Sequence, residues 1–179
     1  MRTVFLVSAA AFAAATASPA LAEDPCCPKA ITPEVITALG EPVGWLVAGQ
    51  TVHTPSAQTM MGLPVSYIVV VHSGGAADAP VTELFYRLQG SSKPFGQRFA
   101  LDVRKAFDKD FPGADCEKTS CSMGFKTTAT GQLVDAALSE GELSLPKEAH
   151  GDGLKLVKAD MNLANADPVF VDCNYLPHK

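Results

Sequence analysis

The segment Cys116–Leu145 constrains the fold more than any other part of the chain. Its sequence is CEKTSCSMGFKTTATGQLVDAALSEGELSL, in which two cysteines with four residues between them precede a strand-like run at 122–126. Thr130 is a suitable N-cap for a helix over 130–140, and Gly141 is a suitable residue to end it. This pattern predicts a disulfide-stapled α+β domain.

The N-terminus has the pattern of a secretory signal peptide. Arg2 precedes the apolar run 4–17, and the triplet 20–22 is a small-x-small cleavage site. A membrane-spanning anchor is the alternative, but a span needs about 20 strongly apolar residues and this run is short and rich in alanine. We therefore expect cleavage at Ala22-Glu23, a signal peptide over 1–22, and one α+β domain over 23–179 in the periplasm, or in the medium if the protein is fully secreted.

The charge of the chain argues against nucleic acid and anionic membranes as partners. The chain has 14 Lys and Arg against 19 Asp and Glu, which gives a formal net charge of −5, and its basic residues form no cluster. Proteins that bind phosphate-rich partners concentrate positive charge on one surface. The expected partner is therefore a protein or a small molecule, without stable insertion into a membrane.

The five cysteines are expected to form disulfides, because the periplasm is an oxidising compartment. A turn between Cys116 and Cys121 brings this pair together, and a structural staple is the leading interpretation, with a redox-active pair as the alternative. Cys173 is expected to bond either Cys26 or Cys27, which would tie the two ends of the mature chain together. Adjacent cysteines rarely bond each other, so one of Cys26 and Cys27 should remain as a spare thiol.

The other segments predict a sheet and two further helices. Thr32 and Pro33 begin a short helix over 33–39 that ends at Gly40, and apolar spacing predicts a helix over 99–111 that packs Phe99, Val103 and Phe107 on the sheet. A loop over 54–64 carries the exposed-looking pair Met60 and Met61. The strands are expected at 43–52, 65–71, 81–88, 122–126, 143–145, 154–163 and 169–175.

The expected fold class is therefore α+β. A single domain is built on an antiparallel β-sheet or small sandwich, which is covered by the two amphipathic helices over 99–111 and 130–140. The runs at 65–71 and 81–88 are expected to be neighbouring antiparallel strands, and the first is β-branched almost throughout, so that both of its faces should be covered.

No catalytic motif is present in the sequence. The chain lacks a phosphate-binding glycine loop, a GxSxG elbow, an HExxH helix and repeated CxxC pairs. Its four histidines, His53, His72, His150 and His178, are scattered, although partners in a Cys–His pair need not be adjacent in sequence. The sequence predicts no catalytic residues, no cofactor and no enzymatic activity, and a secreted hydrolase is a distant alternative.

Copper binding is the alternative function from another class. Met60, Met61, His53 and His72 are ligand types that suit periplasmic copper, and Met123 and the spare thiol could add to them. Each also has a structural interpretation, because methionine commonly fills cores and single histidines at strand ends are commonly solvated.

The C-terminal third resembles the invasion-associated locus B family of periplasmic proteins. The likeness lies in the C-x4-C pair of Cys116 and Cys121, the strand after it, the LVDAALSEG run at 133–141 and a strand-like tail. The earlier tryptophan-and-cysteine segment of that family is represented only by Trp45, because no cysteine lies between Cys27 and Cys116. The resemblance implies a β-rich, non-catalytic exported protein linked to envelope stress or host-cell interaction. The leading expectation is thus an exported binding or envelope-accessory factor.

Overall fold

The computed structural model describes residues 26–47, 49–55, 58–89, 103–117, 119–140, 155 and 169–177. The elements in chain order are α1 (Pro33–Ala38), β1 (Pro42–Trp45), β2 (Gln50–His53), β3 (Thr59–Met60), β4 (Leu63–His72), the 3₁₀ turn η1 (Ser73–Gly75), β5 (Val81–Leu88), α2 (Arg104–Asp110), β6 (Asp115–Cys116), β7 (Ser120–Gly124), β8 (Leu133–Glu140) and β9 (Val169–Tyr175).

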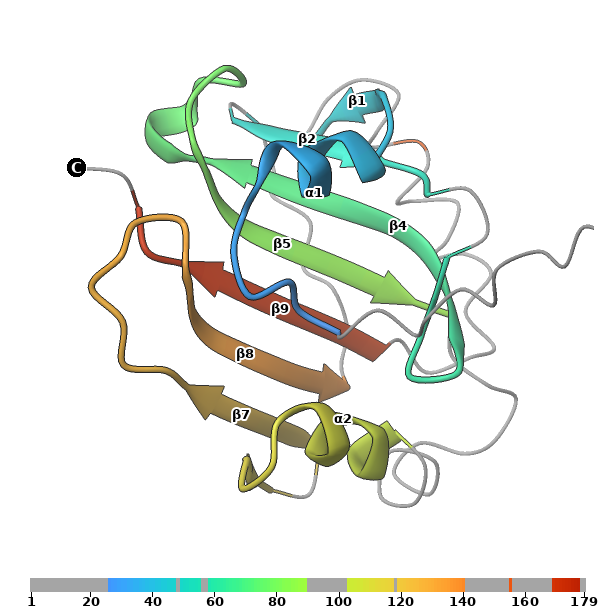
Figure 1. The fold of residues 1–179 in the computed structure, drawn as a ribbon. Helices are drawn as coiled ribbons and strands as arrows, with labels where there is room; N and C mark the ends of the chain where they lie inside the picture. The colour runs from blue at the N-terminus through green and yellow to red at the C-terminus, as the bar shows by residue number, and fades with distance from the viewer. Residues whose placement is uncertain are drawn as a thin grey trace, which may run out of the picture.

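The nine described strands join into one sheet, in which each pair of neighbouring strands is antiparallel. The order is β1-β2-β4-β5-β9-β8-β7-β6, and β3 pairs with β4 away from this path. The last strand, β9, therefore lies in the middle of the sheet between β5 and β8 (Figure 1). This arrangement confirms the antiparallel sheet, and it joins segments that are far apart in the sequence.

The central strands β4 and β5 form where β-branched and aromatic residues were expected to form strands. Ile68 and Val70 are buried on one face of β4, and Tyr67 and Val69 are buried on the other. Successive side chains in a strand point to opposite faces, so this burial shows that both faces of β4 are covered. The expected antiparallel pairing of the two runs is also confirmed.

The main core lies on the face of the sheet that carries α1, α2 and the N-terminal arm, which is the front face in Figure 1. Phe107 and Val103 are almost fully buried there, and the rings of Phe107 and Phe111 lie 4.8 Å apart. The expected packing of α2 is confirmed for these residues, whereas Phe99 lies outside the described residues. Because α2 presents one apolar stripe and exposes Lys105, it covers the sheet as an amphipathic helix.

The short helix α1 forms as its capping residues predict. The Val35 N–H donates to Thr32 Oγ1 at 3.3 Å, Pro33 occupies the first turn, and Gly40 adopts a positive φ of 73° after the helix. No residue within α1 itself is buried, but Leu39, directly after it, enters the core. The helix therefore covers little of the sheet.

The prediction of a helix over 130–140 is wrong, because residues 133–140 of this segment form strand β8. Its apolar residues are spaced as in a helix, yet Ala136 and Leu138 alternate with partly exposed residues as a strand requires. Strand β8 pairs with β7 on one side and β9 on the other, and these two ladders outweigh the helix propensity of Ala, Leu and Glu. Only one of the two expected covering helices is therefore present.

The prediction of a single strand over 43–52 is also wrong. The segment forms a hairpin of β1 and β2, and Gly49 in the turn has a positive φ of 74°. A Cβ at Gly49 would lie 2.5 Å from the Cα of Gly75, so only glycine fits this approach of two turns. The expected loop over 54–64 contains the short strand β3, and Met60 in that strand is buried instead of exposed.

Several expectations lie outside the described residues. They are the signal peptide at 1–22, the strand at 143–145 and all of the strand expected at 154–163 except Lys155, which is helical instead of extended. No helix among the described residues is long and apolar enough to cross a membrane.

Candidate functional site

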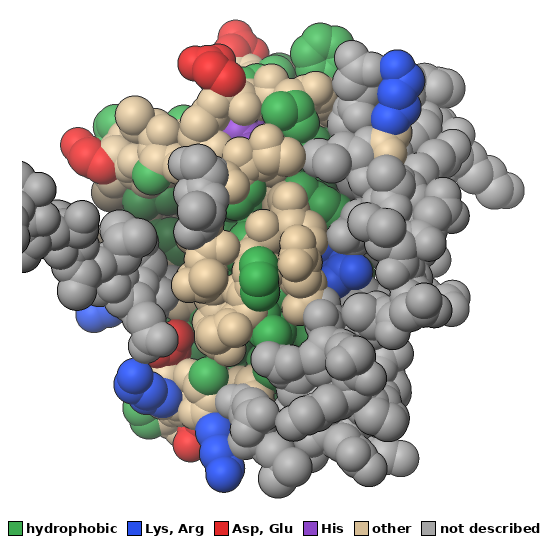
Figure 2. Space-filling model, turned by 90° about the vertical axis from the view of Figure 1, so that its right-hand side faces the viewer, with side chains coloured by type: hydrophobic (Ala, Val, Ile, Leu, Met, Phe, Trp, Pro, Cys, Tyr) green, Lys and Arg blue, Asp and Glu red, His purple; other side chains and the backbone are tan. Residues whose placement is uncertain are grey.

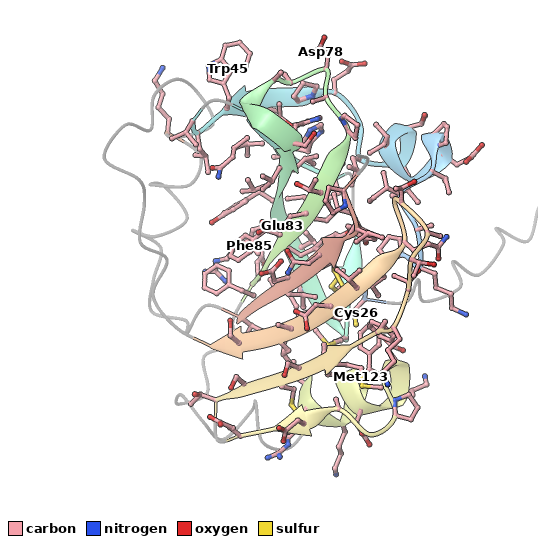
Figure 3. All side chains as sticks on the ribbon, turned by 90° about the vertical axis from the view of Figure 1, so that its left-hand side faces the viewer. Cys26, Trp45, Asp78, Glu83, Phe85 and Met123 are labelled. Atoms are coloured by element: carbon pink, nitrogen blue, oxygen red, sulfur yellow. A yellow bond between two sulfur atoms is a disulfide. The ribbon has the colours of Figure 1, made fainter. Side chains whose placement is uncertain are left out.

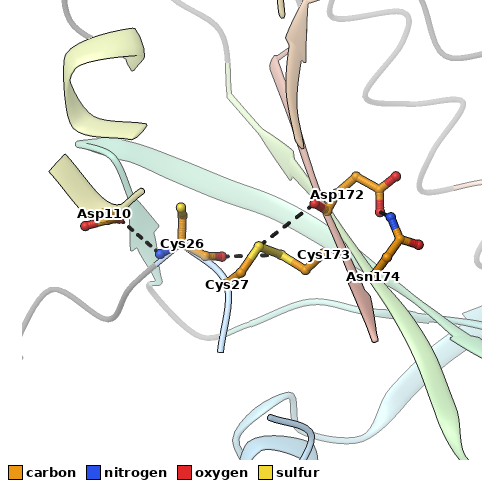
Figure 4. Close-up of a disulfide and its surroundings, with 6 residues drawn as sticks. All are labelled: Cys26, Cys27, Asp110, Asp172, Cys173 and Asn174. Atoms are coloured by element: carbon orange, nitrogen blue, oxygen red, sulfur yellow. Dashed lines mark hydrogen bonds between the residues drawn. A yellow bond between two sulfur atoms is a disulfide. The ribbon is translucent and has the colours of Figure 1, made fainter. Parts of the chain in front are cut away.

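Three cysteines meet where the N-terminal arm crosses β9. Cys27 bonds Cys173 with a Cα–Cα distance of 5.7 Å, and Cys26 is a free thiol (Figure 4). The sequence left open which of Cys26 and Cys27 pairs with Cys173. The arm bends at Cys26 and Cys27, so that only one of the two side chains faces β9. Figure 4 shows Cys27 directed at β9 and Cys26 directed away from it.

Both sulfur atoms of this disulfide lie near backbone carbonyl oxygens. Cys173 Sγ is 3.6 Å from the oxygen of Cys26, and Cys27 Sγ is 3.9 Å from the oxygen of Asp172 (Figure 4). Disulfide sulfurs carry no hydrogen, so both are close S···O contacts. They place the Cys26 backbone directly against the disulfide.

The thiol of Cys26 is held in its protonated form. Its side chain is fully buried, and its backbone N–H donates to Asp110 Oδ2 at 3.2 Å. Burial first, and then the charge of Asp110 and the hydrogen bond that its carboxylate accepts from the thiol, raise the pKa of Cys26 well above its usual range. A protonated thiol is a poor nucleophile and a poor metal ligand, so Cys26 is unreactive in this arrangement.

Two tyrosines on the same face border the cysteine cluster. Burial, followed by the nearby Tyr86 and Cys26, raises the pKa of Tyr175. Its hydroxyl is buried and finds no hydrogen-bond partner among the described residues. A buried hydroxyl without a hydrogen-bond partner lowers the stability of the folded protein. The Tyr175 O–H is therefore a buried donor that has no acceptor among the described residues.

The second disulfide closes a hairpin. Cys116 and Cys121 face each other across β6 and β7 with a Cα–Cα distance of 4.0 Å, which is the pairing that the short spacing suggested. Arg104 at the start of α2 donates from Nη2 to the Cys116 oxygen at 2.8 Å. These contacts tie the helix to the hairpin, which suits a structural staple.

Two of the alternative copper ligands, Met60 and His53, lie far apart along β4. Met60 lies opposite Leu63 of β4, whereas His53 lies opposite Ile68 of the same strand. At about 3.4 Å per residue these positions are about 17 Å apart. Among the described residues no group of three or more His, Cys, Asp or Glu side chains is placed to hold a metal ion.

The histidines of this set are already engaged. His53 Nδ1 donates to the Gly40 oxygen at 3.0 Å, so Nε2 of the neutral ring accepts from Thr51 Oγ1 at 3.0 Å. Burial lowers the pKa of His53, which agrees with a neutral ring. His72 Nδ1 donates to the Ala79 oxygen at 2.7 Å.

A pair of carboxyl groups lies on the opposite face of the sheet. Glu83 on β5 is opposite Asn174 on β9. Asp172 lies two residues before Asn174 on β9, so its side chain is on the same face of the sheet. Burial, the charge of Asp172 and a hydrogen bond to it raise the pKa of Glu83 to about 7. Burial also raises the pKa of Asp172. The sequence carried no signal for this pair, because its partners are distant in the chain.

Aromatic rings continue this face toward the end of β5. The rings of Phe85 and Phe170 stack with their centroids 5.0 Å apart, and the Arg87 guanidinium lies 5.5 Å from the Phe170 centroid. Phe85 and Glu83 extend on the side away from Cys26 in Figure 3. Phe170 and Arg87 are buried, so this cluster contributes to packing.

Among the described residues, the large apolar side chains that stay exposed lie on β1 and on α1 beside it. Trp45 is 61% exposed, Val43 is 43% exposed, and Ile36 on α1 is 36% exposed. Strand β1 ends the strand order, so one of its edges pairs with no other described strand. Figure 3 shows Trp45 extending outward at the end of the molecule that also carries Asp78. A short, interrupted edge strand is indicated in the sequence by one proline and two glycines, Pro42, Gly44 and Gly49.

The described side chains therefore include an exposed apolar group around β1 and a cysteine cluster. No protein-family model, no curated protein and no solved structure matches the chain.

Proposed function

We propose that the protein is an exported, non-enzymatic binding protein of the periplasm, an envelope-accessory factor that holds an extended segment of a partner protein along β1. The observation that carries the proposal is the 61% exposure of Trp45 on an edge strand. Neighbouring exposed apolar side chains can mark interaction surfaces, and Trp is enriched among residues that dominate binding energy.

An edge strand binds an extended segment through its backbone. The outer edge of β1 offers N–H and C=O groups that another strand can pair with, as in β-strand addition. Apolar side chains beside the edge then select apolar residues at alternate positions of the incoming segment. Val43 and Trp45 would make these contacts, with Ile36 at their margin.

The charges near this edge favour a basic partner segment. Glu34, Glu41 and Asp78 are all exposed. Figure 2 shows acidic and apolar side chains next to one another at the upper end of the molecule, the end that carries β1 and α1 in Figure 1. The formal net charge of −5 acts in the same direction. The partner segment is accordingly extended, with apolar residues alternating with Lys or Arg.

Export and the lack of catalysis rest on separate grounds. The signal-like N-terminus and the two disulfides support export to an oxidising compartment. The resemblance to the invasion-associated locus B family supports a non-catalytic role.

Intact-mass analysis of the periplasmic fraction should give a chain that begins at Glu23, and a mass that retains residues 1–22 would contradict soluble export.

Binding is tested with two synthetic peptides, one alternating Val with Lys and one alternating Val with Glu. Trp45 is the one tryptophan of the chain, so its fluorescence reports this edge alone. We expect the Val/Lys peptide to shift the Trp45 emission to shorter wavelength, with saturation, and the Val/Glu peptide to bind at least about tenfold more weakly.

Variants separate edge binding from non-specific attraction. With labelled Val/Lys peptide, Trp45→Ala and Val43→Ser should each weaken binding about tenfold, whereas Lys105→Ala on the exposed side of α2 should leave it unchanged. Equal binding by Trp45→Ala and the wild type, or equal binding of both peptides, would exclude β1 as the proposed site.

A further inference from the structure

We propose that Cys26, Cys27 and Cys173 form a thiol–disulfide exchange site, in which Cys26 can replace Cys27 as the bonding partner of Cys173. The site would thus hold two alternative disulfides in one place. The proposal concerns the N-terminal arm and is independent of binding at β1.

Proximity is the first argument. The oxygen of Cys26 lies 3.6 Å from Cys173 Sγ, and the Cα atoms of Cys27 and Cys173 are 5.7 Å apart. Consecutive Cα atoms are about 3.8 Å apart, and bonded cysteines have Cα atoms about 4.4–6.8 Å apart. A shift of the arm by one residue would therefore bring Cys26 within bonding distance of Cys173.

Contacts of the arm explain why one isomer is held at rest. The Cys26 N–H is bound by Asp110, and the Ile31 N–H donates to the Gly131 oxygen at 2.9 Å. The Leu133 N–H donates to the Lys29 oxygen at 3.0 Å. These bonds fix the register of the arm, and the buried Cys26 stays protonated beside Asp110. Exchange therefore requires release of the arm from α2.

The unpaired hydroxyl of Tyr175 is the second, independent observation. Tyr175 lies two residues after Cys173 on β9, so both side chains are on the same face of the sheet. Its hydroxyl is buried, has no partner among the described residues, and is close enough to Cys26 for the charge of the thiolate to act on it. A phenol O–H can donate to a thiolate sulfur, which would stabilise the attacking or the leaving sulfur during exchange.

The reaction needs no external oxidant. The Cys26 thiolate attacks Cys173 Sγ, the Cys27–Cys173 bond breaks, and the Cys26–Cys173 bond forms. Cys27 leaves as a thiolate and takes up the proton that Cys26 lost. One disulfide and one thiol are present before and after, so the overall oxidation state is unchanged.

Single serine variants give the first test. Peptide mapping of oxidised, folded Cys27→Ser should recover a Cys26–Cys173 bond and leave no free thiol. The matched variant Cys26→Ser should retain the Cys27–Cys173 bond, again without a free thiol. Two free thiols in folded Cys27→Ser would overturn the proposal, because Cys26 would then be unable to reach Cys173.

The wild type gives a second test, which does not depend on the folding of a variant. The protein is incubated at about pH 9 in mild denaturant, quenched with acid and alkylated, and the alkylated cysteine is identified. We expect label to move from Cys26 to Cys27 with time, and the rate to rise about tenfold per pH unit while the thiol is protonated. Asp110 of α2 and Tyr175 of β9 interact with Cys26, and Tyr86 of β5 in turn acts on Tyr175. Tyr175→Phe should slow the movement of label. Label that stays on Cys26 under all conditions would refute exchange.

Discussion

Glu83 on β5 lies diagonally across from Asp172 on β9, one cross-strand pair away, and the Asp172 carboxyl helps to raise the pKa of Glu83. Glu83 lies on the side of the sheet away from Cys26 in Figure 3, and the register of β5 with β9 places Asp172 on the same face as Glu83. Burial and the charge of Asp172 raise the pKa of Glu83 from an ordinary value of 4.5 to about 7. Because the unfolded chain ionises at the ordinary value, this pair makes stability depend on pH.

We expect Glu83→Gln to remove most of this dependence. Between pH 4.5 and about 7 the folded wild type holds a proton that the unfolded chain has lost, so its free energy of unfolding falls as pH rises. The amide introduced by Glu83→Gln would still donate to Asp172 but cannot ionise. Urea unfolding at several pH values should show the variant more stable than the wild type above pH 7, by about 1 kcal/mol once solvent screening of this partly exposed pair is considered.

The exposed Glu41 provides the control for that measurement. Glu41→Gln should follow the wild-type dependence on pH. Identical pH profiles for Glu83→Gln and the wild type would mean that the pKa of Glu83 is not raised in the folded protein.

Phe107→Ala should destabilise the protein strongly. Phe107 is fully buried between α2 and the sheet, and its ring lies 4.8 Å from that of Phe111. Emptying a buried aromatic site costs about 3–5 kcal/mol. Lys105→Ala, on the exposed side of the same helix, should change the free energy of unfolding by less than about 0.5 kcal/mol in the same denaturant titration. A loss below about 1 kcal/mol for Phe107→Ala would contradict the packing of α2.

The strands that the sequence predicted correctly are those with a strong local pattern. Val81–Leu88 and Val169–Tyr175 have the bounds that β-branched and alternating residues indicated, and α1 follows from Thr32 and Pro33. In contrast, β8 has a helix-like composition, and only its pairing with β7 and β9 makes it a strand. Pairing between distant segments is not encoded in a local window, so propensity alone led to the wrong element.

The candidate sites depended even more on long-range contacts. The close spacing of Cys116 and Cys121 predicted their bond, because such a short turn closes locally. The choice of Cys27 over Cys26 depends on the direction in which the arm crosses β9. Glu83 and Asp172 meet only through the register of β5 with β9, which no spacing in the sequence indicates.

Gly49→Ala should be more damaging than Gly40→Ala. Both glycines have positive φ, 74° and 73°, so both substitutions incur about 1–2 kcal/mol for a left-handed backbone. A Cβ at Gly40 meets nothing within 4 Å, whereas one at Gly49 would meet the Gly75 backbone at 2.5 Å. Thermal unfolding should therefore give the lower Tm for Gly49→Ala. Equal Tm values would show that the two turns are not in close contact.

The two disulfides should differ in their contribution to stability. Cys27–Cys173 spans 146 positions and Cys116–Cys121 spans 5, so the loop-closure model gives about 5 kcal/mol for the first and about 2 kcal/mol for the second. Cys173→Ala removes the long-range bond whichever of Cys26 and Cys27 would form it, and a Cys116→Ser/Cys121→Ser double variant removes the short one. Urea unfolding without reductant should rank Cys173→Ala as the less stable of the two.

Reductant should bring the free energies of unfolding of both variants and the wild type close together, because the bonds act mainly on the unfolded chain. A Cys173→Ala protein as stable as the double variant under oxidising conditions would show that the N-terminal arm is not held by this bond in solution.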